Sequence, residues 1–187
     1  MKDQRLPPGQ TEAKGTPLRH IGSIPKFDPN TWRLEVTGEV ENPTTFTLED
    51  LKTQPSVTSL SDFHCVEGWS ILNNKWEGIA FETIAKIVKP KKTVKYATFE
   101  CSDGYTTSLP LADLLQNKAL LAYKLDDKPL PPERGAPLRL ITPQKYAYKN
   151  PMWLKKIKLT QKQEQGYWET RGYSNTANPW KQERYKN

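Results

Sequence analysis

A chain of 187 residues, of which 35% are hydrophobic, is long enough to bury one sizeable core, and no apolar run approaches the roughly 20 residues of a membrane span. Sixteen prolines, ten glycines and many Thr, Val, Tyr and Trp residues argue against a helical bundle and favour a strand- and loop-rich α+β fold. The net charge of +7 favours an anionic partner, but the Lys and Arg residues are scattered and follow no nucleic-acid-binding motif, so we expect no nucleic-acid partner.

The chain shows no internal repeat and no composition shift that would divide it into two globular parts. Residues 1–30 are polar and rich in proline, which predicts an extended arm lying over one domain at 31–187. The first residues lack the apolar core of a signal peptide, and two cysteines are too few for a disulfide scaffold. We therefore expect a cytoplasmic protein, although an exported form whose leader has been removed would look the same.

Hydrophobic periodicity predicts the order of the elements. Residues 32–38 alternate between apolar and polar, which indicates a half-buried strand, and Thr47 with Asp50 has the spacing of a capping box for a short helix. The tail at 166–185 is too aromatic to be disordered and should pack back on the domain. The other predicted elements are a strand at 57–60, a helix at 81–88, strands at 94–101 and 105–109, a helix at 111–115, a strand at 119–125, a rigid Pro-rich loop at 129–137, and strands at 138–142 and 153–159.

Residues 62–70 read Asp-Phe-His-Cys-Val-Glu-Gly-Trp-Ser and place a lone cysteine between a histidine and a Gly-Trp turn. A thiolate is a soft metal ligand and a strong nucleophile, so Cys65 in this polar and aromatic setting suggests metal or redox chemistry. The alternative is a structural cysteine, because a free cysteine also behaves as a small hydrophobic residue.

Five segments occur in the order expected for one family, namely 64–70, 95–101, 130–139, 143–153 and 166–175. Together they resemble the sulfite oxidase family of molybdopterin enzymes, and most nearly its small bacterial oxidoreductases and the catalytic subunit of the periplasmic methionine-sulfoxide reductase. The resemblance implies a strand-rich mixed α+β domain of the molybdopterin-binding type. It also implies that Cys65 completes the coordination of a molybdenum held by the two sulfurs of one pyranopterin dithiolene, because that metal needs a soft, deprotonated donor.

The resemblance implies further cofactor-binding residues. Cys101 stands where the reductase branch has a cofactor-contacting threonine, and an ordinary strand-end cysteine is the alternative. Arg134 stands where relatives have Asn or His at the pterin. Arg139 matches an arginine that looks like a phosphate clamp, whose fork of donors suits bidentate binding, with a surface salt bridge as the alternative for both arginines. Lys149 and Asn150 fall in the loop that holds the terminal phosphate in relatives.

The sequence departs from the family at two places. Pro151 and Met152 stand where relatives have a small apolar residue and a lysine, so one phosphate donor is missing, and Lys145 or Lys149 would have to compensate. His20 lies where the reductase branch has an Asn-Asn segment at the pterin, and either a loop histidine or a pterin ligand is consistent with the sequence.

His64 directly precedes the predicted metal ligand, so we name it as a candidate catalytic residue. If its side chain faced the metal, it would bind an anionic substrate or relay protons. Adjacent residues of an extended segment point to opposite sides, however, which favours a His64 that braces the loop from behind and a Phe63 that shares the side of Cys65.

The sequence thus favours a molybdenum-molybdopterin oxidoreductase that transfers an oxygen atom to or from a small anion or oxide. A single imidazole is a weak anion trap, so reduction of S- or N-oxides is favoured over sulfite oxidation. No haem or iron–sulfur spacing is present, and we expect an external electron-transfer partner. The alternatives are a non-catalytic anion- or protein-binding module with the same fold, and a thiol reductase that pairs Cys65 with Cys101.

Overall fold

The computed structural model describes residues 5–116 and 118–186 as two sheets with three short α-helices and three 3₁₀ turns. The strands are β1 (Thr11–Glu12), β2 (Leu34–Gly38), β3 (Thr44–Phe46), β4 (Ser56–His64), β5 (Trp69–Ala80), β6 (Tyr96–Cys101), β7 (Thr106–Pro110), β8 (Leu120–Leu125), β9 (Lys128–Pro129), β10 (Arg139–Ile141) and β11 (Leu154–Thr160). The helical elements are α1 (Leu48–Lys52), α2 (Phe81–Val88), α3 (Leu111–Gln116), η1 (Pro132–Arg134), η2 (Ala147–Lys149) and η3 (Glu169–Arg171). This mixed, sheet-rich architecture confirms the predicted α+β class.

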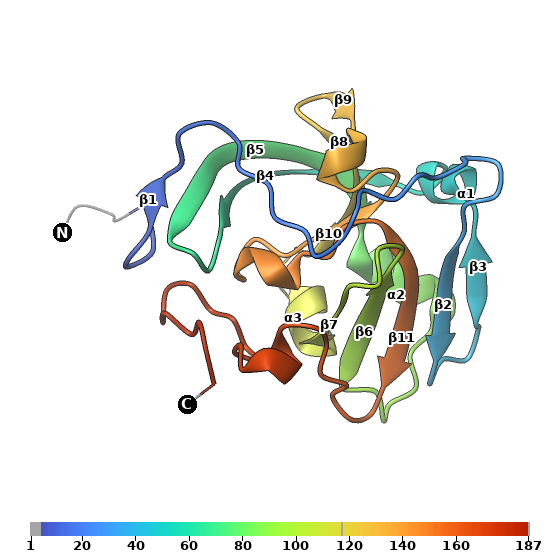
Figure 1. Cartoon of the computed structure of the whole chain (residues 1–187). Coiled ribbons are helices and arrows are strands. Elements are labelled where there is room, and N and C mark those ends of the chain that lie inside the picture. The colour runs from blue at the N-terminus through green and yellow to red at the C-terminus, as the bar shows by residue number, and fades with distance from the viewer. Residues whose placement is uncertain (1–4, 117, 187) are drawn as a thin grey trace.

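The two sheets have different strand orders (Figure 1). One sheet runs β3-β2-β11-β6-β7, and β11 pairs parallel with β2 and antiparallel with β6. The other runs β1-β5-β8-β10, with β4 paired to β5 and β9 paired to β8. Consecutive strands pair in both sheets, but β11 joins β2 to β6 and β5 joins β1 to β8, so segments far apart in the sequence also lie side by side.

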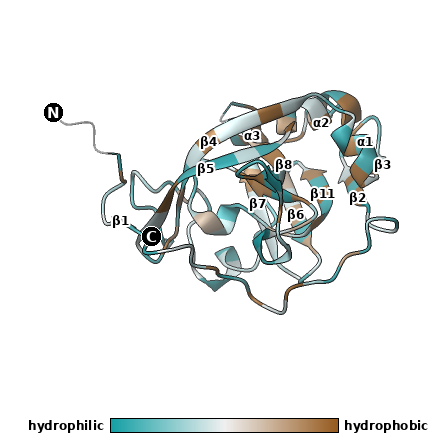
Figure 2. Ribbon diagram, turned by 90° about the horizontal axis from the view of Figure 1, so that it is seen from above, coloured by the Kyte–Doolittle hydropathy of each residue, from teal (hydrophilic) through white to brown (hydrophobic). Residues whose placement is uncertain are grey.

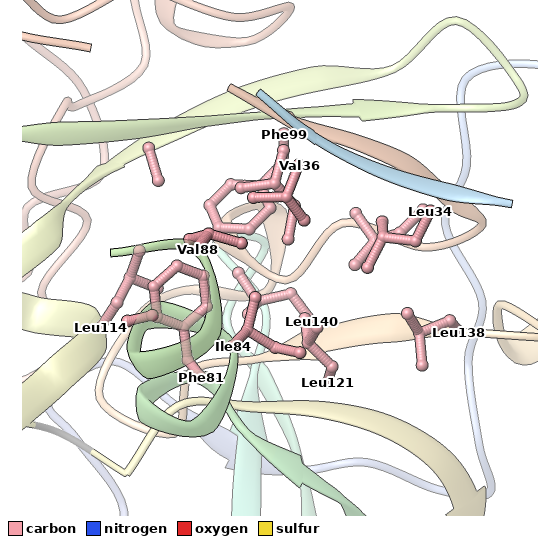
Figure 3. Close-up of a cluster of buried hydrophobic side chains, with 14 of the residues drawn as sticks. Leu34, Val36, Phe81, Ile84, Val88, Phe99, Leu114, Leu121, Leu138 and Leu140 are labelled. Atoms are coloured by element: carbon pink, nitrogen blue, oxygen red, sulfur yellow. The ribbon is translucent and has the colours of Figure 1, made fainter. Parts of the chain in front are cut away.

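The main hydrophobic core lies between the sheets and the face of α2 (Figure 3). Phe81, Ile84 and Val88 are all at most 1% exposed, because the i, i+3, i+7 spacing puts them on one face of the helix. They meet Phe99 of β6 and Leu121 of β8, which come from different sheets. The helix predicted at 81–88 is confirmed with these bounds.

The capping box predicted for the first helix is also present. Thr47 Oγ1 accepts a hydrogen bond from the Asp50 backbone N–H at 3.0 Å, and the Asp50 carboxylate accepts one from the Thr47 backbone N–H at 2.8 Å. These two bonds begin α1 at Leu48, and its buried residue Leu51 attaches the helix to the core.

The longest strand, β5, was not predicted. Its residues 73–77 are Asn, Asn, Lys, Trp and Glu, and Asn73 has a positive φ of 58°, so the alternation of apolar and polar residues is broken. The strand predicted at 57–60 is likewise longer in the structure, where β4 runs from Ser56 to His64. Figure 2 shows that β4 and β5 form one long ribbon, which reaches toward the end of the molecule where β1 lies.

The two terminal segments lie against this ribbon. Residues 5–30 contain β1, which pairs with β5 at Trp69, and otherwise extend over the domain (Figure 1). In the C-terminal tail, Tyr167 and Trp168 pack against the core, but Trp180 and Tyr185 are 48% and 60% exposed. The ring of Tyr185 still packs edge-on against that of Tyr173, with ring centres 5.2 Å apart, so the prediction that the aromatic tail packs back fails at Trp180. Within the described residues, every helix is too short or too polar to cross a membrane.

Candidate functional site

Cys65 sits at the tip of the β4–β5 ribbon, in a tight turn. Its backbone N–H donates to Trp69 O at 2.8 Å, and its carbonyl accepts from the Gly68 N–H at 3.1 Å. Gly68 has a φ of +102°, and a Cβ there would lie 3.2 Å from Gly9 O, so the turn requires glycine. The cysteine is therefore held on a hydrogen-bonded hairpin rather than on a loose loop.

The hairpin is also fixed from the terminal segments. Gln10 Nε2 donates to Cys65 O at 2.9 Å, and the Arg184 guanidinium donates to both Val66 O and Gly9 O. The carbonyl of Cys65 thus accepts two hydrogen bonds, which fixes the backbone that carries the thiol.

His64 ends β4 and pairs with Ser70 of β5 in this hairpin. It is 5% exposed, its Nδ1 is 2.8 Å from Ser70 Oγ, and it is not among the residues that line the cavity described below. Burial lowers the pKa of its imidazole, and the nearby carboxylate of Asp62 binds Arg5 and the Asn73 backbone N–H. The structure thus does not bring the predicted catalytic residue His64 to the cavity, and this placement favours the bracing role that side-chain alternation indicated.

A cavity of about 290 Å³ opens beside the hairpin and is lined by both Cys65 and Phe63, as the alternation predicted. Cys65 is only 5% exposed, and burial raises the pKa of its thiol to about 11. A free thiol in this place is therefore protonated at neutral pH, which disfavours the thiol-reductase alternative, whereas a bound metal would displace that proton.

Arg139 of β10 lines the same cavity and is 3% exposed. Its Nη1 and Nη2 donate to backbone carbonyls, Arg134 O at 2.9 Å and Asn150 O at 3.3 Å, while its Nε has no partner within the described residues. Its guanidinium lies 5.4 Å from the ring centre of Phe63 and 5.0 Å from that of Trp76. The surface salt bridge considered as an alternative is thus excluded, because this cation is buried and faces no carboxylate in any described ion pair.

The charge of Arg139 is costly where it stands. Burial, with a contribution from the nearby cation of Arg134, lowers its pKa to about 9, so it is still charged at neutral pH. Arg134 lines the cavity as well, and its Nη2 donates to Thr16 O at 2.7 Å. Two guanidinium groups that share one cavity wall repel each other unless an anion lies between them.

Asn150 is 4% exposed and also lines the cavity. Its side-chain oxygen accepts hydrogen bonds from the backbone N–H and the hydroxyl of Thr142, and its carbonyl accepts from Arg139. The residue holds the loop and the arginine in place. Pro151 and Met152, where the sequence departs from the family, line the cavity too.

Two predicted cofactor contacts are not brought to the cavity. Lys149 is fully buried away from it, where its ammonium group forms an ion pair with the Glu169 carboxylate and donates to Ser108 O at 2.8 Å. Cys101 is 1% exposed in the main core and does not line the cavity. Lys145, the other residue proposed to compensate for the missing lysine, is paired with Asp113 at 2.6 Å. The structure thus does not bring these three side chains to the cavity, because each is occupied by a partner or by the core.

Much of the remaining cavity wall is aromatic. Trp153 directly precedes β11, Trp168 and Tyr173 belong to the C-terminal tail, and Trp153 Nε1 donates to Pro132 O at 2.7 Å. His20 also lines the cavity, and its ring lies 6.0 Å from that of Trp153. Sequence reasoning named His20 only as an alternative, since no motif connects the arm to the cavity.

The mouth of the cavity carries an ion pair that sequence reasoning missed. Arg19 Nε lies 2.9 Å and 3.0 Å from the two carboxylate oxygens of Glu67, and Trp69 Nε1 donates to the same carboxylate at 3.0 Å. All three residues line the cavity, and the side chains of Arg19 and Glu67 are 62% and 44% exposed, so they mark its solvent side. The pair joins residues 48 positions apart, which no local pattern could indicate.

Known proteins share the sequence and the fold of this chain. The family model described as "Oxidoreductase molybdopterin binding domain" matches residues 20–168. The chain is 38% identical over 182 residues to the uncharacterized oxidoreductase YuiH of Bacillus subtilis, which covers 97% of this chain and 92% of that protein. It is 30% identical over 161 residues to the protein-methionine-sulfoxide reductase catalytic subunit MsrP of Campylobacter jejuni, covering 77% of this chain and 54% of that protein.

The fold has a counterpart among solved structures. The sulfane dehydrogenase SoxCD of Paracoccus pantotrophus superposes with a TM-score of 0.74 at 21% identity, over 83% of this chain and 46% of that chain. These matches confirm the resemblance and the fold that the sequence motifs implied. The chain spans nearly all of YuiH but only about half the length of the reductase and dehydrogenase relatives.

Proposed function

Since this chain belongs to the family of oxidoreductase molybdopterin-binding domains, a family of enzymes, we propose that its cavity holds one molybdopterin and that Cys65 is the protein ligand of the molybdenum. The observation that carries this proposal is that one cavity is lined by both a buried free thiol and a buried arginine without a carboxylate partner. A soft metal and an anionic group would each meet the donor they need there.

The residues present fit a phosphate-bearing cofactor. Arg139 offers an Nε that no described atom accepts from, and Arg134 adds a second positive charge to the same wall. The rings of Phe63 and Trp76 flank the Arg139 guanidinium and keep water from it. An anionic phosphate would satisfy Nε and remove the repulsion between the two arginines.

The bound cofactor would supply two-electron oxygen-atom transfer, which side chains alone do not perform. The chain's own part is to fix the thiol on the hydrogen-bonded hairpin, to hold the phosphate, and to exclude water with the aromatic wall of Trp153, Trp168 and Tyr173. We propose reduction of small S- or N-oxides as the direction, with electrons from a separate partner. The MsrP relative, whose name describes a sulfoxide reductase, supports this direction.

Replacement of the thiol tests the proposal. Cys65→Ser exchanges a soft donor for a hard, mostly protonated hydroxyl, so turnover of dimethyl sulfoxide with reduced viologen should fall by about a hundredfold or more. Cys101→Ser is the matched control, because that cysteine lies in the core and away from the cavity. A Cys65→Ser variant that keeps turnover within about threefold of the parent would contradict metal ligation by this thiol.

Sulfite oxidation with ferricyanide is measured on the same samples. A larger kcat/KM for sulfite than for the oxides at neutral pH would show that the proposed direction is wrong while leaving the cofactor site in place. If the protein carries no molybdenum and turns over neither class, it is the non-catalytic binding module that the sequence left as an alternative.

A further inference from the structure

The Arg19–Glu67 ion pair lies at the mouth of the cavity, and Arg19 Nε contacts both carboxylate oxygens of Glu67. Both nitrogen-to-oxygen distances from Arg19 Nε are close to 3 Å, so one nitrogen is shared between the two carboxylate oxygens. Glu67 belongs to the same turn as Cys65, two residues further along the chain, while Arg19 comes from the N-terminal arm. Both residues line the cavity that the buried thiol also lines, and both side chains are exposed to solvent.

The charges at the mouth of the cavity decide which substrates approach. Arg134 and Arg139 are engaged by the wall and, under the proposed function, by the cofactor phosphate. Arg19 is then the cation nearest to solvent among the described lining residues, and Glu67 cancels it. Asp103 lines the same cavity and adds a negative charge. The attraction of Arg19 for an entering anion is therefore opposed by the carboxylate of Glu67 beside it.

We propose that Glu67 is a specificity-determining residue: by neutralising Arg19 at the mouth, it makes the site select neutral oxides over anionic substrates. The proposal rests on the proposed function for the identity of the reaction, but its electrostatic part concerns only residues of this chain. It explains why an arginine stands at the entrance of a protein with a net charge of +7 without making that entrance an anion site.

A merely structural role for Glu67 would have a different consequence. The carboxylate also accepts from Trp69 Nε1 at 3.0 Å, so it could serve only to brace the turn. Glu67→Gln separates the two roles, because the amide oxygen still accepts from Trp69 while the negative charge is lost. Arg19→Gln removes the opposite charge, and the double variant removes both.

The test measures sulfate binding by isothermal titration calorimetry, on protein purified from a host that makes molybdopterin. Sulfate is a dianion that undergoes no redox chemistry here. We expect Glu67→Gln to bind sulfate about tenfold more tightly than the parent at low salt, Arg19→Gln to bind it more weakly, and the double variant to lie near the parent. The differences should shrink at high salt, because the mouth is exposed. Glu77→Gln is the matched control, since Glu77 pairs with Lys124 at 2.7 Å outside the cavity.

Turnover gives the second readout. In Glu67→Gln the ratio of kcat/KM for sulfite to that for dimethyl sulfoxide should rise by about tenfold, mainly through a lower KM for sulfite. Unchanged sulfate affinity in Glu67→Gln, or an equal gain in Glu77→Gln, would overturn the proposal. If Glu67→Gln does not fold, Arg19→Gln decides alone, and an unchanged affinity there is equally contradictory. A protein without molybdenum or turnover would refute the proposed function, yet the order of the sulfate affinities would still test the role of Glu67.

Discussion

His64 Nδ1 lies 2.8 Å from Ser70 Oγ across the hairpin that presents Cys65. Ser70 donates its single hydroxyl proton to Gln10 Oε1 at 3.0 Å, so Nδ1 of His64 is the donor in the other bond. Gln10 Nε2 then donates to Cys65 O at 2.9 Å. One chain of buried hydrogen bonds thus runs from the imidazole to the backbone of the cysteine.

From these hydrogen bonds we predict that His64 supports the hairpin without taking part in the reaction. His64→Leu should lower the free energy of unfolding by about 1–3 kcal/mol, because it leaves buried polar groups unsatisfied, and His64→Asn, which keeps a donor, should lose less. Chemical denaturation measures both. Turnover per bound molybdenum should stay within about tenfold of the parent, whereas a loss of about 10²–10⁴ in a folded, loaded His64→Asn protein would restore the catalytic role.

Gln10 of the N-terminal arm should also support the hairpin that carries Cys65. It is 8% exposed, and its side chain satisfies both Cys65 O and Ser70 Oγ. Gln10→Ala should therefore cost about 1–3 kcal/mol and lower the molybdenum content of the purified protein. Thr11→Ala is the control, because Thr11 is exposed and its hydroxyl lies 3.4 Å from Gly68 O. If both variants behave alike, the arm does not position the cysteine through Gln10.

Features that depend on residues close together in the sequence could be predicted from it. The capping box of Thr47 and Asp50 and the helix at 81–88 are set by residues three or four apart, and both were predicted. The opposite sides of His64 and Cys65 followed from alternation along β4, which is equally local.

Features that depend on tertiary pairing were missed or misplaced. The partner of Lys149 is Glu169, twenty residues later, and no spacing rule connects them. The motif therefore predicted Lys149 at the phosphate, although the ammonium group of Lys149 forms an ion pair with Glu169 in the protein interior. In β5, polar residues at Asn73 and Asn74 obscure a strand that its pairing with β4 and β8 stabilises.

Replacing Arg139 should weaken cofactor binding but stabilise the cofactor-free protein. If it holds the cofactor phosphate, Arg139→Ala should cost roughly 1.5–3 kcal/mol of cofactor affinity, the scale of a charged hydrogen bond, and the protein should purify with much less molybdenum. Arg139→Met should at the same time stabilise the cofactor-free protein by about 1 kcal/mol or more, because it removes a buried charge without a carboxylate partner.

Thermal or urea unfolding of cofactor-free samples measures the second effect. In an anion site that is formed before the anion binds, a binding residue is expected to destabilise the cofactor-free protein. Full molybdenum occupancy in Arg139→Ala would mean that the phosphate is held elsewhere.

The Lys149–Glu169 pair should matter for stability rather than for the cofactor. Both side chains are fully buried, and although burial lowers the pKa of Lys149, the adjacent carboxylate of Glu169 favours the charged form. Lys149→Met should cost about 3–5 kcal/mol because it leaves Glu169 buried and uncompensated, and adding Glu169→Leu should recover part of that loss. The fraction of folded protein that carries molybdenum should not change in the double variant. A selective loss of molybdenum there would return Lys149 to the phosphate site.

The most direct measurement is the molybdenum and pterin content of the purified chain. Protein from a host that makes molybdopterin should contain about one molybdenum and about one pterin per chain, determined by elemental analysis and by the fluorescence of the oxidised pterin. Protein from a host that cannot make the cofactor should contain neither and should gain both when loaded. Absence of molybdenum and pterin from folded protein made in the competent host would contradict the assignment of the Cys65–Arg139 cavity.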